Sequence, residues 1–275
     1  EVSLLNATKI SGRTKGGLGI GVFNAVTNNT WAEVEDTLTG VTRRIMTEPV
    51  TNYNMLVLDQ TLKNDSYISA MNTSVIRAGE KNDNFYTANV TGFEALIKTP
   101  DRLWSASAGA ALSQKYYSSE PTALGHSLNF NAGKTGGKFR TDYNLSVMSA
   151  TYDPNDMGYL RTTNEIEHSL DVAYNTYEPF GNIMTTRTSL DFSYGQLYSP
   201  RAFTSAGVSL DAMILLMNYW SLSLDLELEP WGENDYFEPR TRDMSMYSHR
   251  PPAFQAGFRG DTDKSKRFYI RGNAE

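Results

Sequence analysis

The chain of 275 residues contains no cysteine. This absence excludes disulfide bonds, thiolate zinc sites and a cysteine nucleophile. The sequence also lacks any run of about 18 apolar residues, so no transmembrane helix is predicted. A formal net charge of −6 leaves no broad basic surface for nucleic acid.

Strict alternation of apolar and polar residues is the pattern that does recur. From Trp220 to Leu228 every even-numbered residue is large and apolar, and every odd-numbered residue is Ser, Asp or Glu. A period of two residues indicates a β-strand with one apolar face and one polar face. The mean hydropathy is only −0.44 because the two faces average out, as they do in transmembrane β-barrels.

Similar patterns and turn signals predict about fourteen strands. They lie near residues 4–13, 17–27, 52–62, 65–77, 84–98, 102–116, 123–133, 138–152, 164–177, 181–197, 202–214, 218–229, 252–259 and 267–273. Most exceed the roughly 9–11 residues that cross a bilayer at a tilt, whereas soluble sandwich strands usually have about 5–6 residues. The predicted fold is therefore all-β: an antiparallel, up-and-down transmembrane β-barrel, with residues 1–275 in one domain.

The predicted connections alternate between short and long. The long ones are 28–51, 78–83, 117–122, 153–163, 198–201 and 230–251. Short periplasmic turns and longer outer loops are typical of outer-membrane barrels. With that orientation the first strand begins outside and the last strand ends outside, so we expect part of a larger barrel that is incomplete at both ends.

Charged residues occupy polar positions of the central strands. Because charge on the lipid side costs about 2–4 kcal/mol for a midplane Arg or Lys, we expect these residues to face the lumen. They are Arg140, Asp142, Glu165, Glu167, Asp171, Arg187, Asp191, Asp211, Asp225 and Glu227. The excess of acids favours cations if the lumen is open. A plugged lumen, in which the charges pair across strands, is an equal alternative.

Aromatic residues near the strand ends predict two interfacial belts. Trp104, Phe139, Phe180, Trp220 and Phe268 are near short turns, and Tyr116, Tyr152, Tyr194 and Tyr198 are near long loops. Trp31, Trp231 and Tyr236 lie within long loops. There they could stack on glycans, although loop anchoring is the commoner role.

Catalytic chemistry is not predicted. His126 and His168 share the parity of the apolar residues in their strands, and nothing places a serine and an acid beside His249. We therefore predict no enzyme and assign no catalytic residue.

Two acidic loop groups are candidate calcium ligands. They are Asp153, Asn155 and Asp156, and then Glu233, Asn234, Asp235 and Glu238. Because neither spacing matches an EF-hand, solvated loops are favoured, and no metal or cofactor is predicted. The Arg259-Gly-Asp261 sequence has the form of an adhesion motif, but the topology predicts an ordinary turn there.

Four motifs carry a family resemblance. They are Lys9–Gly17 followed by Ile20–Thr27, Glu48-Pro-Val-Thr-Asn-Tyr53, Asn155-Asp-Met-Gly-Tyr-Leu-Arg-Thr162 and Arg250-Pro-Pro-Ala-Phe254. In this order they resemble an uncharacterised family of bacterial outer-membrane proteins, in which a family-9-type carbohydrate-binding domain precedes a β-barrel. The resemblance implies a place in the outer membrane and carries over no catalytic residue.

The expected function is that of an outer-membrane barrel serving as a channel or as a membrane platform for envelope transport, with glycans or secreted material as candidate cargo. Its expected partners are outer-membrane lipid and envelope proteins or glycans. One alternative is an outer-membrane enzyme with its site on the long extracellular loops. Another is a soluble β-sandwich adhesin or glycan-binding protein.

Overall fold

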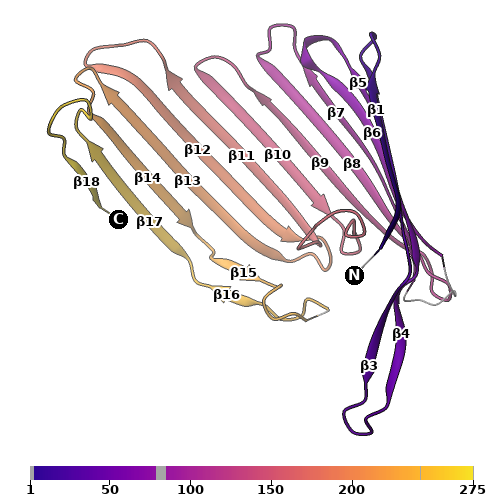
Figure 1. Cartoon of the computed structure of the whole chain (residues 1–275). Coiled ribbons are helices and arrows are strands. Elements are labelled where there is room, and N and C mark those ends of the chain that lie inside the picture. Colours follow the sequence, from indigo (N-terminus) through magenta and orange to yellow (C-terminus); the bar gives the residue numbers. More distant parts are fainter. Residues whose placement is uncertain (1–2, 79–84, 242, 275) are drawn as a thin grey trace. The chain divides into compact units, whose positions relative to one another are not determined.

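The computed structural model describes residues 3–78, 85–241 and 243–274 (Figure 1). The chain divides into two compact units. Unit 1 comprises residues 1–96, 109–128 and 148–163, and unit 2 comprises residues 97–108, 129–147 and 164–275. The acidic residues that form the candidate functional site all lie in unit 2: Asp171, Asp191, Asp211, Asp225 and Glu227.

The structure is all-β and antiparallel. Its strands are β1 (Leu4–Arg13), β2 (Leu18–Thr27), β3 (Thr30–Glu35), β4 (Thr42–Glu48), β5 (Val50–Thr61), β6 (Tyr67–Ala78), β7 (Thr87–Lys98), β8 (Trp104–Tyr116), β9 (Ala123–Lys134), β10 (Phe139–Met148), β11 (Glu165–Thr176), β12 (Ile183–Leu197), β13 (Phe203–Leu216), β14 (Ser221–Glu229), β15 (Glu233–Asp235), β16 (Ser248–Arg250), β17 (Ala253–Asp261) and β18 (Arg271–Ala274). The only helix among the described residues is the single 3-10 turn η1 (Lys63–Asp65). No described helix is long and apolar enough to cross a membrane.

Sixteen of these strands belong to one large sheet. Its main path runs β1-β2-β5-β6-β7-β8-β9-β10-β11-β12-β13-β14-β17-β18, and β15 and β16 attach beside β13. The separate hairpin β3-β4 projects from the sheet (Figure 1). The all-β antiparallel prediction is confirmed. Because the described strand order is a path with two ends, a closed barrel stays a prediction.

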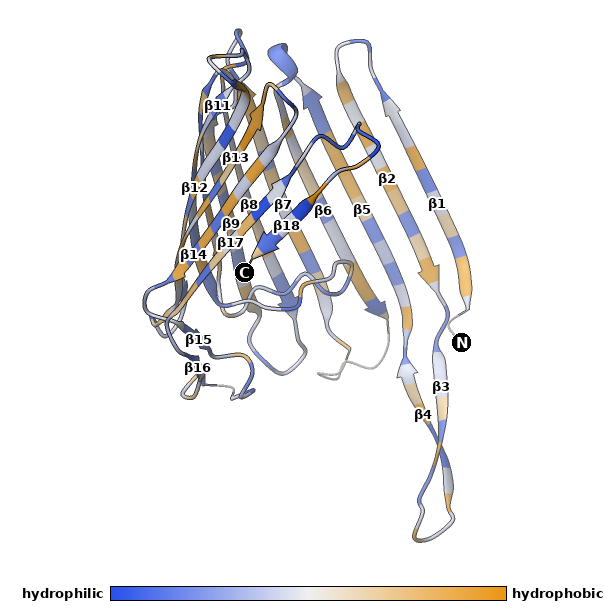
Figure 2. Ribbon diagram, turned by 90° about the vertical axis from the view of Figure 1, so that its left-hand side faces the viewer, coloured by the Kyte–Doolittle hydropathy of each residue, from blue (hydrophilic) through white to orange (hydrophobic). Residues whose placement is uncertain are grey.

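Sequence alternation and tight turns explain why the strands form where they do. Hydrophobic and hydrophilic residues alternate along the strands in Figure 2. Several short connections use residues in the left-handed region, among them Gly17 at φ +85° and Gly137 at φ +88°. Glycine suits such positions because it has no Cβ to clash with the backbone.

All fourteen predicted strands are present, with shifted ends. β10 stops at Met148, so the prediction of a strand to residue 152 is wrong. The chain turns there, and the Tyr152 amide donates to the Ser149 carbonyl at 3.1 Å. Two hairpins were missed, β3-β4 within the predicted loop 28–51 and β15-β16 within the predicted loop 230–251. The predicted connection 78–83 lies, beyond Ala78, outside the described residues.

Few apolar side chains are buried. Among the described residues they are Ala25, Val75, Ala88, Ile166, Leu197, Ala206 and Tyr236. Large apolar side chains are exposed on many strands, for example Ile10 of β1, Phe93 of β7 and Phe254 of β17. The hydrophobic residues of the strands therefore remain largely uncovered by the chain itself.

Candidate functional site

Strand register in unit 2 brings acidic residues face to face. Asp171 of β11 lies directly opposite Asp191 of β12, and Asp211 of β13 lies directly opposite Asp225 of β14. Residues opposite each other in a ladder project to the same side of the sheet. Glu227 follows Asp225 two residues later and so projects to that side as well. We call these five residues the acidic face.

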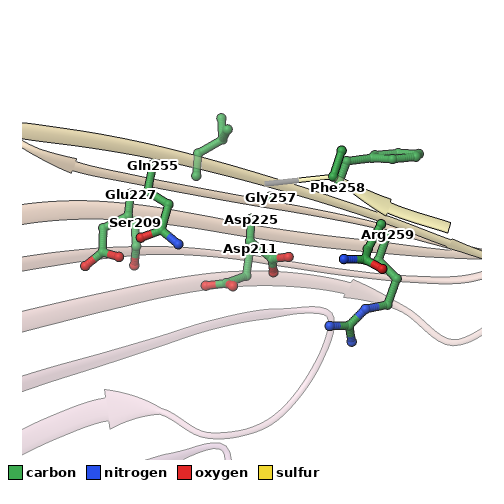
Figure 3. Close-up of a pocket in the computed structure, with 11 residues that line it drawn as sticks. Ser209, Asp211, Asp225, Glu227, Gln255, Gly257, Phe258 and Arg259 are labelled. Atoms are coloured by element: carbon green, nitrogen blue, oxygen red, sulfur yellow. The ribbon is translucent and has the colours of Figure 1, made fainter.

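No Lys, Arg or His forms an ion pair with the acidic face within the described part of the chain, although Arg259 projects to the same side as Asp211 and Asp225 (Figure 3). The ion pairs found there all involve other carboxylates. Like charges directly opposite one another destabilise a sheet, and an unpaired carboxylate away from water costs far more. The arrangement is therefore suited to contact with water and not to a dry interior.

A hollow of about 450 Å³ opens on the acidic face. In Figure 3 the side chains of Ser209, Asp211 and Glu227 project from one side of the ribbons. Gly257 of β17 lies opposite Asp225, and a Cβ at Gly257 would lie 3.6 Å from Asp225 Oδ2. Glycine at this position therefore leaves the hollow open.

The acids of the hollow are not arranged as a set of metal ligands. Its polar lining consists of the acids Asp211, Asp225 and Glu227, the base Arg259, and the uncharged Ser209, Gln255 and Asn273. Within residues 3–78, 85–241 and 243–274, no group of three or more His, Asp or Glu side chains is arranged to hold a metal ion. The site can hold polar or cationic groups through hydrated carboxylates.

The other predicted lumen charges lie on the same sheet of unit 2. Asp142 accepts hydrogen bonds from the side-chain amides of Asn131 and Asn144, each at 2.7 Å. Arg140 Nε donates to the Gly137 carbonyl at 3.2 Å, so this base does not pair with an acid through Nε. Their orientation toward a lumen stays a prediction.

Three more of these residues are placed by register. Arg187 lies opposite Asn175 and Met213 in the ladders of β11 and β13. Glu165 lies opposite Leu197, and Glu167 lies opposite Gly195. None of these positions places a base opposite an acid.

Most of the predicted aromatic belt residues have exposed side chains. These are Trp104, Tyr116, Phe139, Phe180, Tyr194, Trp220 and Phe268. Tyr198 is half-buried, and its ring lies 5.9 Å from the Arg201 guanidinium carbon. Tyr152 lies in a loop whose backbone packs against Gly125, where a Cβ would come within 2.3 Å of it. Membership of an interfacial belt stays a prediction for all nine.

A buried ion cluster in unit 1 was missed by the sequence analysis. Arg77 of β6 donates to Asp156 at 2.7 Å, and the two side chains are 13% and 6% exposed. Lys115 of β8 donates to Asp153 and lies 3.9 Å from Asp156 Oδ2. Both cations lie over the ring of Tyr86, at 4.8 and 4.7 Å from its centroid. We call these five residues the loop anchor, because they fasten the 149–163 loop to the sheet.

The loop anchor overturns the expectation of a solvated loop for Asp156, whose side chain is 6% exposed, whereas the Asp153 side chain remains 37% exposed. Protein cations compensate both carboxylates, and Asp156 is buried. The signal in the sequence was weak: Arg77 and Lys115 are single basic residues in strands, and nothing in the sequence places them beside the 149–163 loop. The second acidic loop group also contributes to structure, because Glu233 accepts from Arg250 Nη1 at 2.8 Å across the β15-β16 hairpin.

Loop anchoring by Asp153 is expected to depend on pH. Burial raises the pKa of Asp153, but hydrogen bonds from Lys115 and the Asn155 amide outweigh burial, so the net pKa lies below the usual value. A carboxyl with a lowered folded pKa stabilises above its unfolded pKa of about 3.9, and this stability is lost as the pH falls through the folded pKa. We expect amide hydrogen exchange in residues 149–163, corrected for the intrinsic rate, to accelerate over that range.

The matched variant is Asp153→Asn, which has no charge to lose. It is expected to exchange faster than the native protein at neutral pH and to show no further acid step. An equal acid step in both proteins would contradict the assignment to Asp153.

The remaining candidate residues contact neighbouring side chains of the protein. Asp261 is buried and accepts from Arg271 Nε at 2.6 Å, so its carboxylate is engaged within the β17-β18 hairpin. His168 Nδ1 lies 2.9 Å from the Tyr143 hydroxyl, and His249 Nδ1 lies 2.7 Å from Asn234 Oδ1. Neither of these two contacts joins a histidine to a serine or to a carboxylate.

Comparison with known proteins gives a family and no further relative. No curated protein and no solved structure matches the chain. The sequence matches, over residues 1–275, the family described as Domain of unknown function (DUF5916). That description names neither a carbohydrate-binding domain nor a membrane, so both stay implications of the motif resemblance. Because the match covers the whole chain, the protein belongs to the DUF5916 family.

Proposed function

We propose that this chain forms part of the wall of an outer-membrane β-barrel, and that its acidic face lines a water-filled path for cationic or uncharged polar solutes. The observation that carries the proposal is that two pairs of aspartates face each other, Asp171 with Asp191 and Asp211 with Asp225. None of the described residues forms an ion pair with these aspartates, and Arg259, which lines the same hollow as Asp211 and Asp225, leaves the acids in excess.

The opposite face of the same strands supports a lipid environment. It carries exposed large apolar side chains from β12, β14 and β17: Phe192, Leu224, Leu228, Phe254 and Phe258. Soluble monomers rarely expose contiguous apolar patches of more than a few hundred Å². A bilayer covers such a face without any further protein.

The acidic face supports an open path over a plugged one. In a plugged lumen, inward charges would pair with opposite charges or with hydrogen-bond donors on the plug. Facing carboxylates that form no ion pair instead need water or mobile cations. A ring of carboxylates attracts cations and repels anions, which is the basis of charge selectivity in pores.

Ion selectivity tests the proposal. The full protein is incorporated into a planar bilayer, and the reversal potential is measured across a KCl gradient. The native protein is expected to prefer potassium over chloride. The combined variant Asp191→Asn, Asp211→Asn and Asp225→Asn is expected to lower that preference several-fold, because most of the fixed charge is gone.

The matched control removes an acid from a turn. Glu178 is 85% exposed, and Glu178→Gln is expected to leave the reversal potential unchanged. A protein without conductance, or a triple variant with native selectivity, would overturn the proposed path.

A further inference from the structure

A second hollow, of about 520 Å³, lies in unit 2. We call it the aromatic hollow. It is lined by Tyr194, Phe203, Trp231, Asn234, Tyr247 and His249. The β15-β16 hairpin supplies Asn234 and His249, which lie directly opposite each other. That hairpin attaches to β13 through Ser205 and Glu233.

Register places the aromatic hollow on the apolar side of the sheet. Ser205 is an odd-numbered residue of β13, as Asp211 is, and its partner Glu233 projects to the same side. Asn234 follows Glu233 and therefore projects to the opposite side, as Tyr194 does. The aromatic hollow is thus distinct from the acidic face and does not depend on an open lumen.

A row of rings leads to the aromatic hollow across five neighbouring strands. Phe130, Tyr143, His168, Tyr194 and Phe203 follow one another with centroid distances of 6.4, 6.3, 6.2 and 6.1 Å. Rings at such distances contact one another in tilted pairs, which limits their motion. The two rings at the hairpin remain available, because Trp231 is 67% exposed and Tyr247 is 50% exposed.

A ring contact and a close backbone approach support the aromatic hollow. Tyr247 contacts the buried Tyr236 in a tilted pair with 4.9 Å between the ring centroids. Gly232, beside Trp231, has φ +68°, and a Cβ there would lie 2.1 Å from the Arg250 carbonyl oxygen. Only glycine lets the two chain segments approach this closely. The aromatic hollow is therefore a preformed feature of the hairpin.

Asn234 and His249 supply hydrogen-bonding groups to the lining beside its aromatic rings. Asn234 Nδ2 donates to the Phe203 carbonyl at 3.4 Å, which orients the amide, and Asn234 Oδ1 then accepts from His249 Nδ1 at 2.7 Å. A histidine that donates through Nδ1 presents Nε2 as an acceptor when it is neutral. No Asp, Glu, Lys or Arg is among the lining residues.

We propose that the aromatic hollow binds an uncharged sugar ring. The C–H faces of a sugar stack on exposed aromatic planes, while its hydroxyls hydrogen-bond to a few fixed polar groups. A phosphate or carboxylate headgroup would find no cation in the lining. The same ring chemistry is offered by a free oligosaccharide and by the headgroup of a glycolipid.

Binding is measured by native mass spectrometry of the full protein released from phosphatidylcholine nanodiscs, which contain no sugar. The free probes are maltohexaose and cellohexaose. The lipid probe is digalactosyl diacylglycerol built into the nanodisc. Saturable binding of a free probe identifies oligosaccharide as the source, and a response to the lipid probe alone identifies a glycolipid.

Two tryptophans provide a matched pair for this experiment. Trp231→Ala is expected to weaken binding about tenfold or more, because it removes the largest available ring. Trp31→Ala removes an exposed tryptophan from β3 and is expected to leave binding unchanged. Trp231→Phe retains an aromatic plane and is expected to keep most of the affinity, which separates loss of stacking from loss of folding.

Two outcomes overturn the proposal: no saturable binding of any of the three probes, or equal binding by the native protein and Trp231→Ala. The conductance experiment reports on the opposite face of the sheet. Failure of the sugar proposal and failure of the proposed path are therefore distinguishable.

Discussion

Replacing Asp156 with alanine is expected to lower the free energy of unfolding by about 3–5 kcal/mol. The substitution leaves Arg77 buried without its carboxylate, and Lys115 keeps only Asp153. Removing one partner of a buried ion pair costs more than the pair contributes, because the remaining charge stays out of water. The measurement is urea unfolding of the protein in lipid vesicles, followed by tryptophan fluorescence.

An exposed ion pair is the matched control for Asp156→Ala. Lys138 Nζ lies 3.8 Å from Glu178 Oε2, and the two side chains are 51% and 85% exposed. Glu178→Ala is expected to cost about 0–1 kcal/mol, because solvent screens the pair. A further double variant, Arg77→Met with Asp156→Leu, removes both charges and is expected to recover much of the loss. Equal costs for Asp156→Ala and Glu178→Ala would contradict the buried loop anchor.

The strands were predictable because their signal is local. Alternation with a period of two, β-propensity and turn signals depend only on neighbouring residues, and all fourteen strands predicted from them are present. The missed strands β15 and β16 have three residues each, too few to show a period. Their pairing with each other and with β13 makes them strands, and that information is not local.

The side of the sheet to which each strand residue projects was predictable, but the register that pairs residues of neighbouring strands was not. Parity placed Asp171 and Asp191 on polar positions, and it placed His168 on the apolar face that it shares with Tyr194. A four-residue turn at 178–181 would instead put Thr188 opposite Asp171. In the structure β11 ends at Thr176 and β12 begins at Ile183, so the connection between them is longer. Asp191 therefore lies opposite Asp171. The facing carboxylates therefore depend on turn geometry that the sequence pattern does not specify.

The loop anchor was the feature that the sequence predicted least. Arg77 and Asp156 are separated by 79 positions, and their contact requires the 149–163 loop to fold back onto the sheet. The glycine at position 125 permits that approach, because the loop backbone occupies the space of its Cβ. An isolated glycine in a strand signals close backbone approach, but it does not identify the segment that approaches.

An arginine at Leu224 is expected to destabilise the protein by about 2–4 kcal/mol, whereas the same residue at Asp225 is expected to cost almost nothing. The two positions are adjacent in β14 but project to opposite sides, because Leu224 pairs with Ala212 and Asp225 pairs with Asp211. Under the proposed function Leu224 faces lipid, where a midplane charge is costly. At position 225 an arginine would instead meet the carboxylates of Asp211 and Glu227. The fraction of folded protein is measured by urea titration in vesicles.

Depth dependence separates a bilayer from a protein core in this experiment. In a bilayer the cost of an arginine falls to about 0–1 kcal/mol near the interfaces, so Leu228→Arg, near the end of β14, should cost less than Leu224→Arg. A second sheet packed over the same face, as in a soluble sandwich, would give costs that follow local packing and not depth. The side chains of Leu224 and Leu228 are similarly exposed, 37% and 43%, so local burial alone predicts similar costs. Equal costs at the two positions, together with folding in buffer without lipid or detergent, would therefore favour the sandwich and end the barrel proposal.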